Sequence, residues 1–364
     1  MDVVRFVAAI VVFLEHFREH TKNRFHAFWD AHPTWYFYSD PYSYTAGMIV
    51  FVLSGYVIAH VMATRERTLV EYSASRFARL YSLMLPTLAI VVVTNYLEAL
   101  RYPHAFDAYA NIPAAIRYLS SGLFISSYWL WPDLSPPNMP TWRLSYEVVY
   151  YVAVAFFVFA KGRTRVLGLI GLALAAGPSI VLLAPTWAVG FWLYHYAKRR
   201  TLHPGAGFVL WLASLVLLLL CPLIEVRFRQ HLPFLRIPDA SVGGLLAAYA
   251  NAFCFALSLF AFNAFAEKAE ILLRPFTTAI RWLGSVTFAM YMLHQPILSF
   301  FTVYGLDDPT SLAQAVLMIG SVLLVVCTIG RYFETSKSAY KRWFLAMWGR
   351  AAPLRLRYAA PPAE

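Results

Sequence analysis

Charged side chains are scarce in this sequence. Asp, Glu, Lys and Arg make up 13% of the 364 residues, whereas 60% are hydrophobic; soluble domains carry roughly 25% charged residues. Apolar runs close to twenty residues long recur along the chain, which predicts transmembrane helices rather than one large soluble core. The net charge of +11 is not gathered on a soluble face. A nucleic-acid partner is therefore not expected.

Cysteine is also rare. The three cysteines, Cys221, Cys254 and Cys327, each lie inside an apolar run, and their odd number and expected burial argue against a disulfide framework. Their spacing matches no metal site. We predict no metal and no permanently bound cofactor. The first apolar run lacks the small-x-small pattern of signal cleavage, so we interpret it as a membrane helix. No internal repeat is visible, which weakens any analogy with inverted-repeat transporters.

The distribution of basic residues predicts the orientation of the helices. About 21 of the 30 Lys and Arg fall on one side when the N-terminus is placed in the cytoplasm, as the positive-inside rule requires. We therefore expect an all-α integral membrane protein with about ten transmembrane helices and both termini cytoplasmic. The predicted helices are 3–19, 46–62, 80–98, 142–160, 164–183, 185–197, 207–222, 241–265, 283–303 and 310–332.

Two parts of the chain fall outside these helices. Residues 113–131 are apolar but rich in serine, and they lead into the turn-rich stretch PDLSPPNMP. They predict a helix at the membrane surface or one that re-enters the bilayer. We expect residues 1–335 to form a transmembrane domain and residues 336–364 a basic cytoplasmic tail.

The first helix carries Arg5 and His16, eleven residues apart. At 100° and 1.5 Å per residue they share one face and lie about 16 Å apart along the axis. Arg5 alone would be a charge that fixes topology, and His16 alone an interfacial histidine at a helix end. Ionisable groups within a membrane, however, usually face the bundle interior and belong to a functional path.

Glu147 gives His16 a predicted partner, within hydrogen-bond reach in the outer half of the bilayer either directly or through one water. It follows Trp142 in TWRLSYEVVYYV, about five residues into a helix that enters from the outside, at a depth comparable to that of His16. A carboxylate can hold a histidine in one tautomer and stabilise its protonated form, as a general base requires. The alternative is a glutamate favoured by the helix dipole at an N-terminal turn.

Two further pairs have the spacing of residues that share a helix face. Tyr291 and His294 are three residues apart in SVTFAMYMLHQPI, near the middle of the membrane. They form either part of a polar pocket or a core pair bonded to neighbouring helices. Arg76 and Arg79 are three apart on the cytoplasmic side. They form either a phosphate clamp or charges that only fix orientation.

Together these motifs resemble the membrane-bound acyltransferase-3 family of bacterial O-acyltransferases. The matching stretches are RFVAAIVVFLEH, IVFVLSGYVIAH, SRFARLY, WRLSYEVVYY and SVTFAMYMLHQP, in the family's order over nearly the whole chain. The resemblance implies ten helices in the bacterial cytoplasmic (inner) membrane. It also implies a cytoplasmic acyl-coenzyme A donor, with acetyl as the acyl group, and transfer to a sugar hydroxyl, commonly on an exported glycan.

The resemblance also implies roles for single residues. His16 and Glu147 would be catalytic, and Arg5, Arg76 and Arg79 would bind the donor phosphates. Supporting pocket residues would be Ser54, Trp142, Tyr150, Tyr291 and His294. The departures from the family pattern include Ser82 where proline often follows RLY, and Glu15 beside the histidine. An extracytoplasmic domain that completes transfer in some members would here be a separate protein.

Several alternatives remain open from the sequence. His16 could deprotonate the acceptor directly or carry the acyl group as an acyl-histidine. A transporter or flippase, in which buried charges carry protons or bind a glycan, is the competing function. The absence of repeats and the arginine pair argue against it. The carbohydrate acceptor cannot be identified from these residues.

Overall fold

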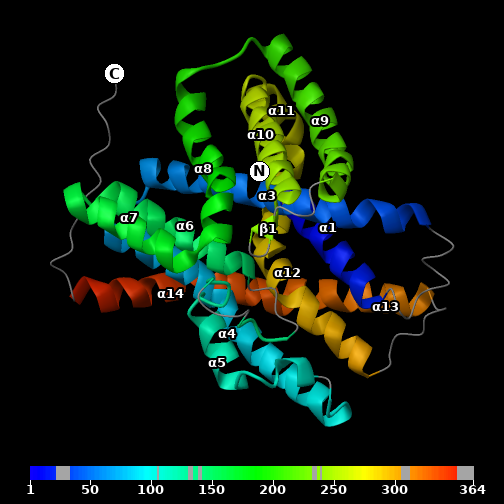
Figure 1. Cartoon of the computed structure of the whole chain (residues 1–364). Helices are drawn as coiled ribbons and strands as arrows, with labels where there is room; N and C mark the ends of the chain where they lie inside the picture. The colour runs from blue at the N-terminus through cyan, green and yellow to red at the C-terminus, as the bar shows by residue number, and fades with distance from the viewer. Residues whose placement is uncertain are drawn as a thin grey trace.

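The computed structural model describes residues 1–21, 33–104, 106–129, 134–137, 142–231, 236–237, 240–304 and 312–350. Nearly all of this part is helical (Figure 1). The helices are α1 (Asp2–Thr21), α3 (Pro33–Thr64), α4 (Leu69–Arg101), α5 (Ala114–Gly122), α6 (Trp142–Phe159), α7 (Gly162–Ala176), α8 (Pro178–Arg199), α9 (Pro204–His231), α10 (Val242–Asn263), α11 (Ala266–Leu273), α12 (Thr277–Val303), α13 (Leu312–Val325) and α14 (Arg331–Arg350). Two short strands, β1 (Arg236–Ile237) and β2 (Ala240–Ser241), pair antiparallel.

Six helical stretches are long and apolar enough to cross a membrane. They are Tyr42–Thr64, Leu69–Arg101, Pro178–Arg199, Pro204–Leu223, Gly244–Asn263 and Ala313–Trp348. At 1.5 Å per residue even the 20-residue stretches reach about 30 Å, the thickness of the hydrocarbon core. The predicted all-α, multi-pass architecture is confirmed. Each of the ten predicted segments overlaps a helix, but ten crossings and cytoplasmic termini stay predictions.

The break between α7 and α8 differs from the sequence prediction. We expected one helix to end near residue 183 and the next to begin at Pro185, but Pro185 lies inside α8. The chain breaks at Gly177, whose φ of 90° favours glycine, and Pro178 occupies the first turn of α8. The local combination of glycine and proline therefore decided the boundary.

Close helix packing depends on small residues at two crossings. A Cβ atom added to Gly190 of α8 would overlap the carbonyl oxygen of Val52 on α3, and one at Gly55 would overlap that of Trp187. These glycines let the two backbones approach each other, as small residues do between membrane helices. Helix α1 packs against α3 and α12. At the crossing of α1 and α12, Gly284 of α12 leaves room for the side chain of Asp2 on α1.

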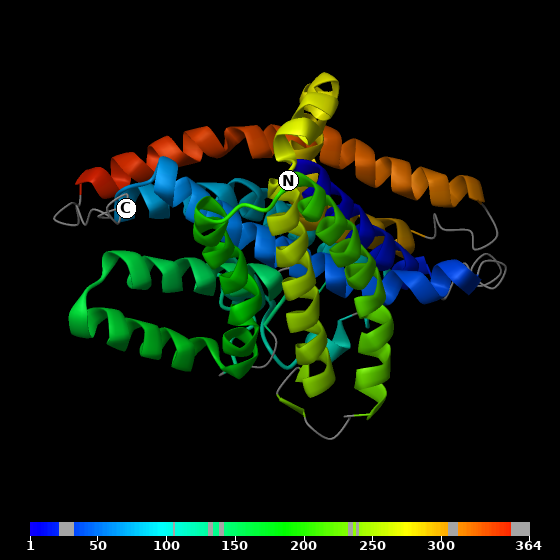
Figure 2. The ribbon, with the colours of Figure 1, turned by 90° about the horizontal axis from the view of Figure 1, so that it is seen from above.

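The end of the described chain is one long helical stretch. Helix α13 continues through the π-helical turn Val326–Gly330 into α14, and Figure 2 shows them as a gently curved unit along one side of the molecule. In Figure 1 the same unit passes behind the other helices. Phe344 of α14 packs against Ala74 and Ala78 of α4. The domain boundary that we expected at residue 335 falls within α14, while residues 351–364 of the expected tail lie outside the described residues.

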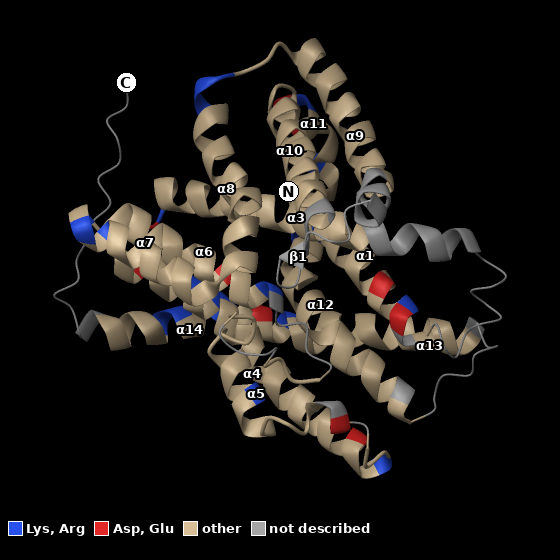
Figure 3. Cartoon of the chain, viewed as in Figure 1, with Lys and Arg blue, Asp and Glu red and all other residues tan. Residues whose placement is uncertain are grey.

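The few charged residues are unevenly distributed over the fold. Most of the helical surface carries no charged residue, and charges gather at helix ends and in the centre of the bundle (Figure 3). All three cysteines lie in the described part of the chain, and none of them forms a disulfide. The central charges are the ones that identify a site.

Candidate functional site

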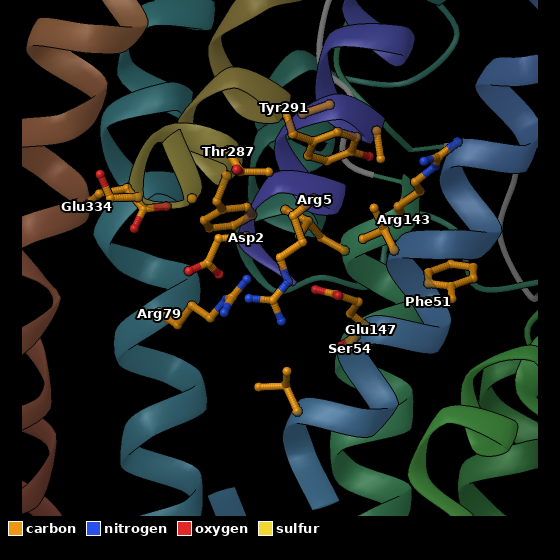
Figure 4. A pocket seen from close by; sticks show the side chains of 18 of the residues that line it. Asp2, Arg5, Phe51, Ser54, Arg79, Arg143, Glu147, Thr287, Tyr291 and Glu334 are labelled. Atoms are coloured by element: carbon orange, nitrogen blue, oxygen red, sulfur yellow. The ribbon is translucent and has the colours of Figure 1, made fainter. Parts of the chain in front are cut away.

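A cavity of about 350 Å³ lies between α1, α3, α4, α6, α12 and α14 (Figure 4). Each of these helices contributes at least one polar side chain to its wall. They include Arg5, Ser54, Arg79, Glu147, Tyr291 and Glu334. Five of the six helices also contain one of the motifs singled out in the sequence, so the fold brings those distant motifs to one place.

The cavity wall is rich in positive charge. Six cationic side chains line it, namely Arg5, Arg76, Arg79, Arg143, Arg281 and Lys337, against three acidic ones, Asp2, Glu147 and Glu334. The cations therefore exceed the carboxylates by three. Because a pocket with apolar walls and low dielectric strengthens such a field, the site favours an anionic ligand.

Arg5 and Arg79 are the cations best placed to bind that ligand. Their guanidinium groups lie side by side in the cavity (Figure 4), close enough to repel each other electrostatically. Arg79 also lies over the ring of Phe288 at 5.7 Å. Within the described ranges neither arginine has a carboxylate partner within ion-pair distance. Two like charges held together in this way are stabilised by an anion between them.

Arg76 differs from Arg79 in its surroundings. It lines the cavity, but it is buried, and its Nη2 donates to both carboxylate oxygens of Glu66, at 2.9 and 2.8 Å. Its guanidinium also packs over the rings of Tyr72 and Tyr151. The expected arginine pair is therefore divided: Arg79 faces the cavity with its charge available, while the charge of Arg76 is already matched.

Glu147 lies among arginines. It comes from the second turn of α6, with Arg143 one turn earlier on the same face, and it interacts electrostatically with Arg5, Arg79 and Arg143. In Figure 4 its carboxylate points toward Arg5. Glu147 therefore offsets part of the positive field and can orient the guanidinium groups that surround it.

His16 lies outside the cavity wall, next to a second histidine. Its ring centroid is 5.1 Å from that of His294 on α12, and its Nδ1 lies 3.2 Å from Oε2 of Glu19. No hydrogen bond or ion pair joins His16 to Glu147 in the part of the chain that the structure describes. The direct hydrogen bond that we expected between these two residues is therefore not formed, and Glu147 lies among the arginines instead. A link through one water stays a prediction.

Helix α12 connects the two places. Tyr291 lines the cavity, and its ring contacts that of His294, with centroids 6.4 Å apart. The prediction that Tyr291 and His294 share a helix face is therefore confirmed. His294 is fully buried, and its Nδ1 lies 2.7 Å from the carbonyl oxygen of Met290. This face of α12 runs from the cationic cavity to His16.

The other supporting residues have separate positions. Ser54 lines the cavity, with its hydroxyl 3.4 Å from that of Tyr151. Tyr150 instead donates a hydrogen bond to the carbonyl oxygen of Ile180 at 2.9 Å and belongs to the packing between α6 and α8. The side chain of Trp142 lies outside the described residues.

Several residues of the cavity wall were not predicted from the sequence. Arg143 could have been found, because it precedes Glu147 by four residues and must share its helix face. Asp2, Arg281, Glu334 and Lys337 gave no such signal, since they lie on α1, α12 and α14, which only the tertiary packing brings together. Glu334 and Lys337 are themselves paired at 3.6 Å on α14.

Comparison with known proteins agrees with the motifs. A family model described as an acyltransferase domain matches residues 1–331, which is most of the 364-residue chain. No curated protein and no solved structure matches the sequence. The match covers α1, α3, α4, α6 and α12, which form most of the cavity wall, and the stretch that carries His16, whereas Glu334 and Lys337 of α14 lie beyond it. This multi-pass membrane protein therefore belongs to the acyltransferase-3 family.

Proposed function

We propose that this protein is a membrane O-acyltransferase that takes an acyl group from cytoplasmic acyl-coenzyme A and transfers it to a hydroxyl group of a carbohydrate. The observation that carries the proposal is the cation-rich cavity between the family's motifs, where Arg5 and Arg79 lie side by side. The family match supports an acyltransferase. Acyl-coenzyme A as the donor, acetyl as the acyl group and a glycan as the acceptor are proposed in addition to what the family match supports.

The charge of the cavity suits the phosphates of coenzyme A. Arg5 and Arg79 would bind the diphosphate through charge-assisted hydrogen bonds, which relieves their mutual repulsion. Arg76, paired with Glu66, would contribute to the field and to the shape of the wall rather than to a direct bond. With a volume of about 350 Å³, the cavity would hold one part of the donor rather than the whole molecule.

The length of α1 suits an extended donor. Arg5 and His16 are on one helix, eleven residues and about 16 Å apart along its axis. The pantetheine arm of coenzyme A is a long chain with the thioester at its end. With the phosphates at Arg5, the arm would run along α1 and the α12 face of Tyr291 and His294, and the thioester would reach His16.

The chemistry at His16 is base-assisted acyl transfer. The neutral imidazole would take the proton of the acceptor hydroxyl as its oxygen attacks the thioester carbonyl, and the carbon–sulfur bond then breaks to release coenzyme A as the thiol. An acyl-histidine relay uses the same residue in two steps. Glu147 would act on the donor side, by orienting Arg5 and Arg143.

The location follows from the charge asymmetry of the sequence. With the basic segments inside, Arg5 and Arg79 lie at the cytoplasmic end of the bundle and His16 in its outer half. Donor and acceptor would then enter from opposite sides of the bacterial cytoplasmic membrane. This arrangement fits a cell-surface or exported glycan as acceptor.

The test uses the purified protein in lipid nanodiscs with labelled acetyl-coenzyme A and a panel of carbohydrate acceptors. We expect label to appear on carbohydrate, or coenzyme A to be released, in the wild type and not in His16→Ala. Retention of activity in His16→Ala would overturn the role of His16. If vesicles containing the protein instead transport a glycan or small polar solute without coenzyme A, the transporter hypothesis replaces the acyltransferase hypothesis.

A further inference from the structure

The immediate surroundings of His16 contain a carboxylate that the motifs do not assign. Glu19 is three residues further along α1, and its Oε2 lies 3.2 Å from Nδ1 of His16. The side chains of His16 and Glu19 are 27% and 48% exposed, so the pair is partly accessible from outside the bundle. The pair lies at the end of α1 opposite to Arg5.

The identity of the bonded nitrogen has a chemical consequence. An ionised carboxylate can only accept a hydrogen bond, so the proton between Glu19 and His16 must be on Nδ1. The neutral imidazole then carries its lone pair on Nε2. A general base needs that tautomer when the acceptor hydroxyl approaches Nε2, and a carboxylate that fixes it also stabilises the imidazolium formed during the reaction.

The neighbouring charged and titratable groups do not compete for this task. Glu15 is buried and accepts hydrogen bonds from Arg18, so its charge is matched on α1. From α12, His294 has its Nδ1 against the carbonyl oxygen of Met290, and Tyr291 lies beyond it. Glu147 is held in the cationic cavity. Glu19 is the carboxylate that meets the His16 ring.

We propose that Glu19 is the positioning residue of His16, holding it as the Nδ1–H tautomer with Nε2 directed to the acceptor hydroxyl. This inference rests on the proposed function for its catalytic consequence. The hydrogen bond itself does not depend on it. Glu19 replaces Glu147 in the orienting role, which leaves Glu147 to the donor side of the same reaction.

The experiment compares Glu19→Ala and Glu19→Asp with the wild type. Glu19→Ala removes the acceptor of the Nδ1–H bond, so the tautomer is no longer fixed, whereas Glu19→Asp keeps a carboxylate. Two readouts are needed: ¹⁵N NMR of labelled histidine, with the His16 signal assigned by its loss in His16→Ala, and steady-state kinetics of acyl transfer. Glu267→Ala, at an exposed glutamate of α11, is the matched control.

We expect His16 of the wild type to be Nδ1–H and that of Glu19→Ala to become a mixture of the Nδ1–H and Nε2–H tautomers. The kcat of Glu19→Ala should fall about tenfold or more, within the roughly 10²–10⁴ that a general base contributes. Its KM for acyl-coenzyme A should stay within about twofold, because the donor phosphates bind at the other end of α1. Glu19→Asp should keep part of the wild-type tautomer and kcat, and Glu267→Ala should change neither.

The outcomes separate this inference from the proposed function. A His16 that remains entirely Nδ1–H in Glu19→Ala overturns the positioning role, whether or not kcat falls, and so does an unchanged kcat with a mixture of tautomers. A wild type that transfers no acyl group contradicts the proposed function instead. The NMR experiment then still measures whether Glu19 holds His16.

Discussion

Arg76 donates from one nitrogen to both carboxylate oxygens of Glu66, and both side chains are buried. Arg79, three residues later on α4, has its guanidinium beside that of Arg5 in the cavity. These two arginines, three residues apart on one helix, therefore have different electrostatic environments. We expect substitution of Arg76 to affect the stability of the protein and substitution of Arg79 to affect donor binding.

Arg76→Ala is expected to destabilise the protein. Removing one partner of a buried ion pair leaves the carboxylate of Glu66 uncompensated, which typically costs about 3–5 kcal/mol. The thermal unfolding temperature of the purified protein in detergent would fall accordingly. The unfolding temperature of Glu66→Gln should be lower as well. The double variant Arg76→Met with Glu66→Leu should unfold at a higher temperature than either single variant. An unchanged unfolding temperature in Arg76→Ala would show that the pair has no structural role.

Arg79→Ala is expected to weaken donor binding with little effect on stability. A hydrogen bond to a charged group contributes roughly 1.5–3 kcal/mol, so the Kd for coenzyme A should rise more than tenfold. Calorimetric titration with coenzyme A measures it, with Lys161→Ala at the exposed end of α7 as a matched loss of positive charge. Equal affinities in the wild type and Arg79→Ala would return this arginine to a purely topological role.

Much of the fold could be predicted from hydropathy, because burial in a membrane demands long apolar helices. The spacing rules also identified the shared face of Tyr291 and His294, which the structure confirms. Spacing fixes only residues on the same helix, however. It could not show that Glu66, in the turn before α4, would pair with Arg76, or that Glu147 would face Arg5 rather than His16.

The carboxylate beside His16 is a case in which spacing on one helix was informative. Glu19 is three residues from His16, so the sequence contained the signal for a contact on one helix face. The depth inferred from the direction of the chain pointed instead to a partner on another helix, Glu147. Short-range spacing was the better guide here, since the relative rotation of α1 and α6 depends on packing that no local pattern encodes.

Gly190→Ala is expected to disturb the crossing of α3 and α8. The added Cβ would overlap the backbone oxygen of Val52, so the helices must move apart. Overpacking of this kind costs about 1–3 kcal/mol. Gly171→Ala on α7 is the control, because a Cβ there meets nothing within 4 Å. We expect a lower unfolding temperature only for Gly190→Ala, and equal values for the two variants would contradict the close contact.

Glu147→Gln is expected to separate binding from turnover. The substitution removes a negative charge from a cavity that binds an anion, so the KM for acyl-coenzyme A should stay equal or decrease. The kcat should fall about tenfold or more, because Arg5 and Arg143 lose the carboxylate that orients them and the thioester is positioned less well. Steady-state kinetics at several donor concentrations give both values. A raised KM with unchanged kcat would assign Glu147 to donor affinity alone.

His16→Ala is expected to abolish transfer and to leave donor binding intact. Loss of a general base lowers a rate by roughly 10²–10⁴, while the phosphates of the donor would bind at Arg5 and Arg79, about 16 Å away along α1. The Kd for coenzyme A should therefore match that of the wild type in the titration used for Arg79→Ala. Arg5→Ala should show the reverse, with a weaker Kd and residual turnover at saturating donor. The two variants together test whether one face of α1 carries two functions. If His16→Ala weakened donor binding as much as Arg5→Ala does, the phosphates and the reacting group could not lie at opposite ends of the helix.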